Sequence, residues 1–181
     1  MNKNKYREHL LKQRLTLSEE ATQKASQEIS QMLIEYIKTN TFTHIAGYKS
    51  IQNEPNLDVF YNWLYEQNTP IFFPKAMGST YKFVETIPTT SFVTGPFQVP
   101  EPEPITPTLE ELDTTPQNTL ILVPGIAFDK EGNRLGFGKG IYDQLLTGIP
   151  GHKIGIGYAF QEIETLPSDT HDIRMDRMIL G

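Results

Sequence analysis

Residues 119–123 (TLILV) combine apolar and β-branched side chains with no alternation of apolar and polar positions. Such a strand is buried on both faces, as strands are in parallel sheets that helices cover. Two more strand patterns, at residues 43–48 and 153–158, alternate along the chain with helical patterns. Strands that alternate with helices favour an α/β fold. We therefore predict a layered α/β protein, with a mostly parallel open sheet and helices on both faces.

Helical patterns are clearest in the first forty residues. Residues 3–15 predict a short helix, and a second helix begins at Thr16 or at Ser18. Residues 16–19 fit the capping-box pattern, while Ser18 competes as the N-cap residue. Apolar residues then recur at spacings of three and four, which predicts one buried helix face. That face comprises Ala25, Ile29, Met32, Leu33, Tyr36 and Ile37.

An apolar run at residues 71–73 is expected to stop at Pro74, and further strands are predicted at residues 80–86 and at a sheet edge at residues 177–180. Residues 88–116 hold seven of the 13 prolines, so we expect a surface connection that could cover a site. This connection is too short to separate two domains. The 181 residues are therefore expected to form a single domain, 1–181.

Composition excludes several classes of protein. The chain has no cysteine, which excludes disulfide frameworks, thiolate metal sites and cysteine nucleophiles. A net charge of −6 does not provide the broad basic face of a general nucleic-acid binder. No apolar run approaches the roughly 20 residues that span a bilayer, and the charged N-terminus is unlike a signal peptide. We expect a cytoplasmic protein that binds neither nucleic acid nor membrane.

The most unusual segment follows the strand at 119–123. It contains RLGFGKGIYD, in which three glycines alternate with other residues between Arg134 and Asp143. Glycines at such spacing let backbone amides converge on an anion, and a helix N-terminus that follows adds partial positive charge. Arg134 and Lys139 flank the glycines and would neutralise a polyphosphate. A glycine-rich turn with two solvated cations has the same composition, so both interpretations stay open.

Several charged residues outside the glycines have two interpretations each. Asp143, near a helix N-terminus, is either a favourably placed acid or a ligand for Mg²⁺, and Asp172 is either a solvated charge or a second carboxylate. Lys3, Arg7 and Arg14 share a helix face, which is either a wet surface or a second clamp on a polyphosphate. Glu54 could cap a helix or accept hydrogen bonds from a ligand.

The glycine segment, together with PGIAFD at residues 124–129 and GN at residues 132–133, resembles the signature of the 5-formyltetrahydrofolate cyclo-ligase family. The likeness extends over nearly the whole chain. It includes Lys3-x-x-x-Arg7, the loop at 48–54, Phe-Pro-Lys at 73–75, Phe97-x-x-Pro100 and Asp172-x-x-x-Asp176. The resemblance implies a Rossmann-like sheet of the cyclo-ligase type. It also implies ATP- and Mg²⁺-dependent cyclisation of 5-formyltetrahydrofolate to 5,10-methenyltetrahydrofolate, through a phosphorylated formyl (iminium phosphate) intermediate.

The resemblance also implies roles for individual residues, with Arg134 and Lys139 as the catalytic pair. ATP would contact Lys3, Arg7, Arg134, Leu135, Gly136, Phe137, Gly138, Lys139, Gly140, Ile141 and Tyr142. The folate would contact Lys49, Glu54, Phe97, Phe137, Gly138, Lys139, Gly140 and Ile141. Asp143 and Asp172 would hold Mg²⁺. ATP and a reduced folate would be the small-molecule partners of a monomer.

Two departures from the family pattern keep other functions open. Many relatives have two tyrosines before the closing aspartate, whereas Ile141 stands first here. Lys49 occupies a position that is apolar in some relatives. A divergent paralogue with the same nucleotide loop and another substrate is one alternative. A non-catalytic module that binds folate is the other.

Overall fold

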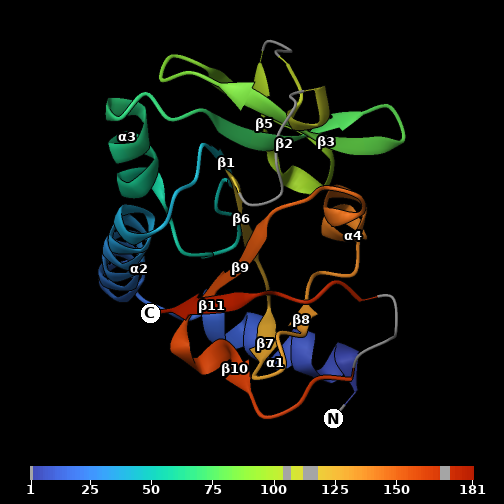
Figure 1. Cartoon of the computed structure of the whole chain (residues 1–181). Helices are drawn as coiled ribbons and strands as arrows, with labels where there is room; N and C mark the ends of the chain where they lie inside the picture. Colours follow the sequence, from blue (N-terminus) through green and yellow to red (C-terminus); the bar gives the residue numbers. More distant parts are fainter. Residues whose placement is uncertain (1, 104–106, 112–117, 168–171) are drawn as a thin grey trace.

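A central six-stranded sheet organises the molecule, in the order β11-β9-β6-β1-β2-β3 (Figure 1). The computed structural model describes residues 2–103, 107–111, 118–167 and 172–181. Neighbouring strands are parallel except for the antiparallel pair β2 and β3, which confirms the prediction of a mostly parallel open sheet. The strands are β1 (His44–Ala46), β2 (Ile71–Met77), β3 (Thr80–Thr86), β6 (Thr119–Pro124), β9 (His152–Gly157) and β11 (Arg177–Leu180).

Helices cover both faces of this sheet, as the sequence predicts. On one face, α2 (Glu19–Thr39) and α3 (Asp58–Glu66) pack against alternate residues of the central strands, such as Leu120 and Leu122. On the other face, α4 (Ile141–Leu146) contributes to the cluster that contains Ile121 and Val123. Every residue of β6 is buried, because the strand lies between these two apolar layers. Burying each large aliphatic side chain there contributes about 1.5–3 kcal/mol.

A smaller three-stranded sheet, β10-β7-β8, lies beside α1 (Lys3–Leu15) (Figure 1). Its strands are β7 (Ala127–Asp129), β8 (Arg134–Leu135) and β10 (Glu162–Ile163). Leu10 of α1 packs with Ile126 and Leu135, which places the first helix directly against the glycine segment. The strands β7 and β8 pair as an antiparallel β-hairpin that leads into the glycines.

The start of α2 is decided by Ser18. Its hydroxyl oxygen accepts a hydrogen bond from the Ala21 backbone N–H at 3.2 Å, so Ser18 is the N-cap residue. Thr16 instead ends α1. The predicted apolar face of α2 is wrong at Met32, which is 38% exposed, because the helix turns Ile34 toward the sheet in its place.

The prediction that Pro74 stops the apolar run at 71–73 is wrong in its structural sense, since that run belongs to β2, which continues through Pro74 to Met77. Phe72 accepts a hydrogen bond from the backbone N–H of Gly47, so the polar groups of residues 72 and 74 face the β1 side. The strand β1 has already ended at Ala46, and no ladder partner needs the N–H that proline lacks. Pairing with β3 on the other side carries β2 onward.

Part of the expected surface connection at 88–116 lies outside the described residues, but residues 88–103 and 107–111 contain more regular structure than their prolines suggest. Strands β4 (Ser91–Thr94) and β5 (Pro100–Glu103) form a two-stranded antiparallel sheet around the short 3-10 helix η1 (Pro96–Gln98). A second short 3-10 helix, η2, spans Leu109–Glu111, and a further one, η4, spans Ala159–Gln161. The paired strands hold Phe97 at their tip in a left-handed conformation, with φ of 56°.

Within the described part of the chain, no helix combines the length and apolar character needed to cross a membrane.

Candidate active site

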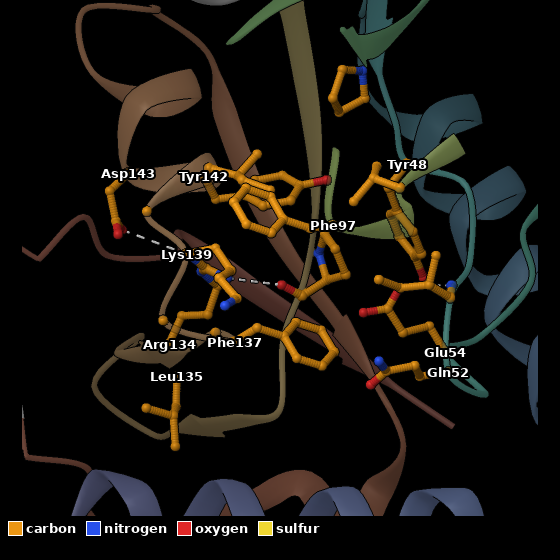
Figure 2. Close-up of a pocket in the computed structure, with 18 of the residues that line it drawn as sticks. Tyr48, Gln52, Glu54, Phe97, Arg134, Leu135, Phe137, Lys139, Tyr142 and Asp143 are labelled. Atoms are coloured by element: carbon orange, nitrogen blue, oxygen red, sulfur yellow. Dashed lines mark hydrogen bonds and ion pairs between the residues drawn. The ribbon is translucent and has the colours of Figure 1, made fainter. Parts of the chain in front are cut away.

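A cavity of about 360 Å³ lies where β1 and β6 end, between the glycine segment and the loop that follows β1 (Figure 2). Carboxyl ends of parallel strands are the usual place for ligand sites in open α/β sheets. The structure brings to this cavity every site residue that the family resemblance implies. They are Lys3, Arg7, Lys49, Glu54, Phe97, Arg134, Leu135, Gly136, Phe137, Gly138, Lys139, Gly140, Ile141, Tyr142, Asp143 and Asp172.

The glycine segment forms one wall of the cavity. Gly138 and Gly140 have φ values of 80° and 69°, in the left-handed region that glycine tolerates best. Gly140 is the N-cap residue of α4. Arg7, from α1, donates a hydrogen bond from its Nε to the Gly136 carbonyl at 2.9 Å, and a Cβ atom on Gly138 would lie 3.3 Å from the same guanidinium. The first helix is therefore docked closely on this segment.

The two cations of the segment differ in how firmly they are held. The Arg134 side chain is 10% exposed, donates to the Pro124 carbonyl at 3.1 Å and lies 3.7 Å from an oxygen of Asp143. Its guanidinium also lies over the Tyr142 ring, 5.2 Å from the centroid. Lys139 is exposed, with its ammonium 5.1 Å from the centre of the Phe97 ring. The arginine is fixed in place, whereas the lysine can follow a ligand.

Two carboxylates line the cavity near these cations. Asp143 lies in the first turn of α4, and Asp172 lies 3.4 Å from the ammonium of Lys3. Among the described residues, no three metal-binding side chains come together. Mg²⁺ is usually held by one or two carboxylates, water and substrate phosphates, so this donor set fits a magnesium ion that arrives with a nucleotide.

The opposite wall contains Glu54, whose side chain is 3% exposed. Its Oε2 accepts a hydrogen bond from the Ile51 backbone N–H at 3.1 Å. Burial raises the pKa of Glu54 to about 7, although the nearby Arg14 and the Ile51 N–H act in the opposite direction. A carboxylate with this pKa changes charge near neutral pH, as groups at functional sites often do.

Arg14 is the residue that sequence reasoning misplaced. It shares a helix face with Lys3 and Arg7, but it is 1% exposed and is not among the residues that line the cavity. The helix packs at this end on the Gly125 backbone and on the loop that contains Gln52, so Arg14 is buried beneath the site. Tyr48 and Gln52 also line the cavity and were not singled out, since single polar residues in a loop carry no distinctive spacing.

Comparison with known proteins agrees with this geometry. The sequence model of the 5-formyltetrahydrofolate cyclo-ligase family matches residues 1–181. The 5-formyltetrahydrofolate cyclo-ligase of Mycoplasma pneumoniae is 30% identical over 99% of this chain and 98% of its own length. That of Haemophilus influenzae is 28% identical over 97% and 95%, respectively.

Solved structures show the same relationship. The structure of 5,10-methenyltetrahydrofolate synthetase from Aquifex aeolicus matches with a TM-score of 0.82 and 32% identity, over 99% of this chain and 90% of that one. The matches in sequence and in fold extend along essentially the full length of this chain. The chain therefore belongs to the 5-formyltetrahydrofolate cyclo-ligase family.

Proposed function

We propose that this protein catalyses the ATP- and Mg²⁺-dependent cyclisation of 5-formyltetrahydrofolate to 5,10-methenyltetrahydrofolate. The reaction releases ADP and phosphate. The observation that carries the proposal is the cavity itself. It joins a glycine segment flanked by Arg134 and Lys139 to a buried carboxylate on the facing wall, Glu54. The first wall suits a polyphosphate, and the second suits the N–H groups of a pterin ring.

The proposed reaction begins when the formyl oxygen of the folate attacks the γ-phosphorus of ATP, and the bond from phosphorus to the β,γ-bridging oxygen breaks. The electron pair leaves with ADP, and the product is an iminium phosphate. The side-arm amine then attacks the iminium carbon, loses its proton, and expels phosphate as the ring closes. No protein nucleophile is needed, so catalysis rests on positioning and charge neutralisation.

The chain's own cations would supply much of that neutralisation. Arg134 and Lys139 come from the glycine segment, and Lys3 and Arg7 come from α1 on the same side of the cavity. Arg134 is already aligned by the Pro124 carbonyl, so little order is lost when it binds phosphate oxygens. Asp143 and Asp172 would hold Mg²⁺, which when bound neutralises phosphate charge.

The folate would occupy the other half of the cavity. Glu54 would accept hydrogen bonds from ring nitrogens, and Phe97 would cover the ring from the tip of the β4–β5 hairpin (Figure 2). Lys49 lines the same half, where its ammonium lies 2.7 Å from Asp58 and 5.0 Å from the centre of the Phe92 ring. We further propose that the protein is a cytoplasmic monomer that acts on these two small molecules. Light scattering would test the oligomeric state.

Incubation with 5-formyltetrahydrofolate and MgATP tests the reaction directly. The absorbance of methenyl-folate should appear only when both substrates and Mg²⁺ are present. A protein that binds both ligands but produces no absorbance change with either formyl isomer would instead favour a divergent paralogue, in which Ile141 helps to select another substrate. Folate binding with no dependence on ATP would favour a non-catalytic binding module.

Replacing Asp143 by asparagine tests the metal assignment. The Mg²⁺ concentration that gives half-maximal turnover should rise at least about tenfold, because one of two carboxylate ligands is lost while the side-chain shape is kept. Glu131→Gln is the matched control, since Glu131 is exposed in the turn of the β7–β8 hairpin and does not line the cavity. An unaltered Mg²⁺ titration in Asp143→Asn would remove Asp143 from the metal site.

A further inference from the structure

The guanidinium of Arg14 connects the two walls of the cavity from beneath. Its Nε donates to the Gln52 carbonyl at 3.0 Å, and its Nη1 donates to the Gly125 carbonyl at 3.1 Å. It also lies over the ring of Phe137, 5.4 Å from the centroid. One buried side chain thus contacts the loop after β1, the residue after β6 and the glycine segment.

Arg14 also pairs with Glu54. The Nη1 atom lies 3.8 Å from Oε1 of Glu54, and the two side chains are 1% and 3% exposed. Charges attract one another strongly when both are removed from water. The Asn53 side-chain amide donates to the Arg14 carbonyl at 3.3 Å, which ties the helix to the same loop a second time.

Other groups near Glu54 do not replace this cation. Arg134 approaches from β8 and favours the charged carboxylate, but less than Arg14 does. The tyrosines around Glu54 are neutral, because burial raises the pKa of each one. They are Tyr48, Tyr61, Tyr142 and Tyr158. Arg14 is therefore the main source of positive charge at Glu54.

The pair has features of a functional arrangement rather than a stabilising one. Nη2 of Arg14 is buried and has no hydrogen-bond partner among the described residues. An unsatisfied buried donor costs stability, and replacing a buried ion pair by apolar side chains is often neutral or stabilising. Stability of the fold alone therefore does not account for a charged pair at this position.

We propose that Arg14 is a positioning residue for the cyclisation: it clamps the loop at 52–54 against the glycine segment, favours the charged form of the Glu54 carboxylate and directs it at the folate half of the cavity. The catalytic part of this proposal rests on the proposed function. The physical part, the control of Glu54 by Arg14, does not.

The pH dependence follows from the charge state of Glu54. Only the ionised carboxylate accepts hydrogen bonds with both oxygens, and the pKa of Glu54 is about 7. Wild-type kcat/KM should therefore decrease as the pH falls through 7. Without Arg14 the neutral form is favoured further, so the decrease should begin at higher pH.

Titration of Glu54 by carbon-13 NMR in the ligand-free protein tests the physical part. The Glu54 signal is identified by its loss in Glu54→Gln. In Arg14→Met the midpoint should move to higher pH by at least about one unit, the usual effect of an adjacent opposite charge. In Arg14→Lys, which keeps the charge, it should move less. A midpoint that stays in place in Arg14→Met would overturn the proposed role of Arg14.

Profiles of kcat/KM against pH test the catalytic part. Arg14→Met should lose about fivefold near pH 7 and about tenfold at lower pH, as its acidic limb moves up by about one unit, and should recover much of this loss near pH 9. The matched control is Lys12→Met, which removes an exposed cation from the same helix. Thermal unfolding of each variant verifies folding, and Arg14→Gln, which also removes the charge, provides the profile if Arg14→Met does not fold.

The outcomes separate the two proposals. A decrease in kcat/KM that is equal at every pH, with an unchanged limb, would reduce Arg14 to a structural residue. A wild-type protein that does not cyclise the folate would overturn the proposed function. The response of Glu54 to Arg14 would still be measured in that case, because the NMR titration needs no substrate.

Discussion

Replacing Lys139 by alanine is expected to lower ATP-dependent turnover by at least about 100-fold, while the affinity for folate remains nearly unchanged. Lys139 stands between two glycines in the left-handed conformation, and its side chain is exposed at the cavity. An ammonium in this position can follow the phosphoryl group as charge moves onto ADP. Steady-state turnover and calorimetric titration with 5-formyltetrahydrofolate measure the two quantities.

Lys130→Ala is the matched control for this variant. Lys130 is also exposed and lies in the turn of the β7–β8 hairpin, but it does not line the cavity. Its removal tests whether loss of one positive charge has a general effect on a protein of net charge −6. If Lys139→Ala turned over at the wild-type rate, the glycine segment would not be the polyphosphate site. A parallel loss of folate affinity would place Lys139 on the folate instead.

The central sheet was predictable because its signals are local. A strand buried on both faces needs apolar residues at every position, and residues 119–123 have them. Pro74 shows where local signals end, because its tolerance depends on how far the neighbouring strand β1 extends. The hairpin of β4 and β5 was missed for a similar reason. Its strands pair through alternating backbone groups, so three prolines in and beside it did not prevent pairing.

The glycine segment was predictable because phosphate chemistry demands small residues and cations at close spacing. The family resemblance then assigned residues such as Glu54 and Phe97, and both line the cavity with that segment. The helix face that joins Lys3, Arg7 and Arg14 was read correctly as a periodicity. The periodicity could not show that the far end of α1 is covered by the loop at 52–54, since that cover comes from another part of the chain.

Asp129 supports the glycine segment from behind and carries the largest predicted effect on stability. The residue is fully buried, and four hydrogen bonds converge on its carboxylate. The donors are the backbone N–H groups of Glu131, Asn133 and Leu166 and the side-chain amide of Asn133. The carboxylate therefore fixes the turn that leads into Arg134. Sequence reasoning included Asp129 in the family signature but gave it no role, because an aspartate before a turn carries no sign of burial.

Replacing Asp129 by alanine should lower the free energy of unfolding by about 3–5 kcal/mol, since several buried donors lose their acceptor together. Turnover should fall as well, because the hairpin no longer holds Arg134 in place. Urea unfolding and the cyclisation assay measure these effects, with Glu131→Gln as the control in the same turn. Asp129→Asn should retain the shape but present an amide N–H₂ to donors, so it should be destabilised to a smaller extent.

The dependence on pH identifies the carboxylate as the cause. Burial alone would raise the pKa of Asp129, but the hydrogen bonds from Asn133, Leu166 and Glu131 outweigh it and lower the pKa. A carboxylate whose pKa is lowered in the folded state stabilises the protein above its unfolded pKa of about 4, and this contribution is lost as the pH falls through the folded value. The difference in unfolding free energy between wild type and Asp129→Asn should therefore narrow in acid. A difference that is the same at pH 7 and pH 3 would mean that side-chain shape, and not charge, holds the turn.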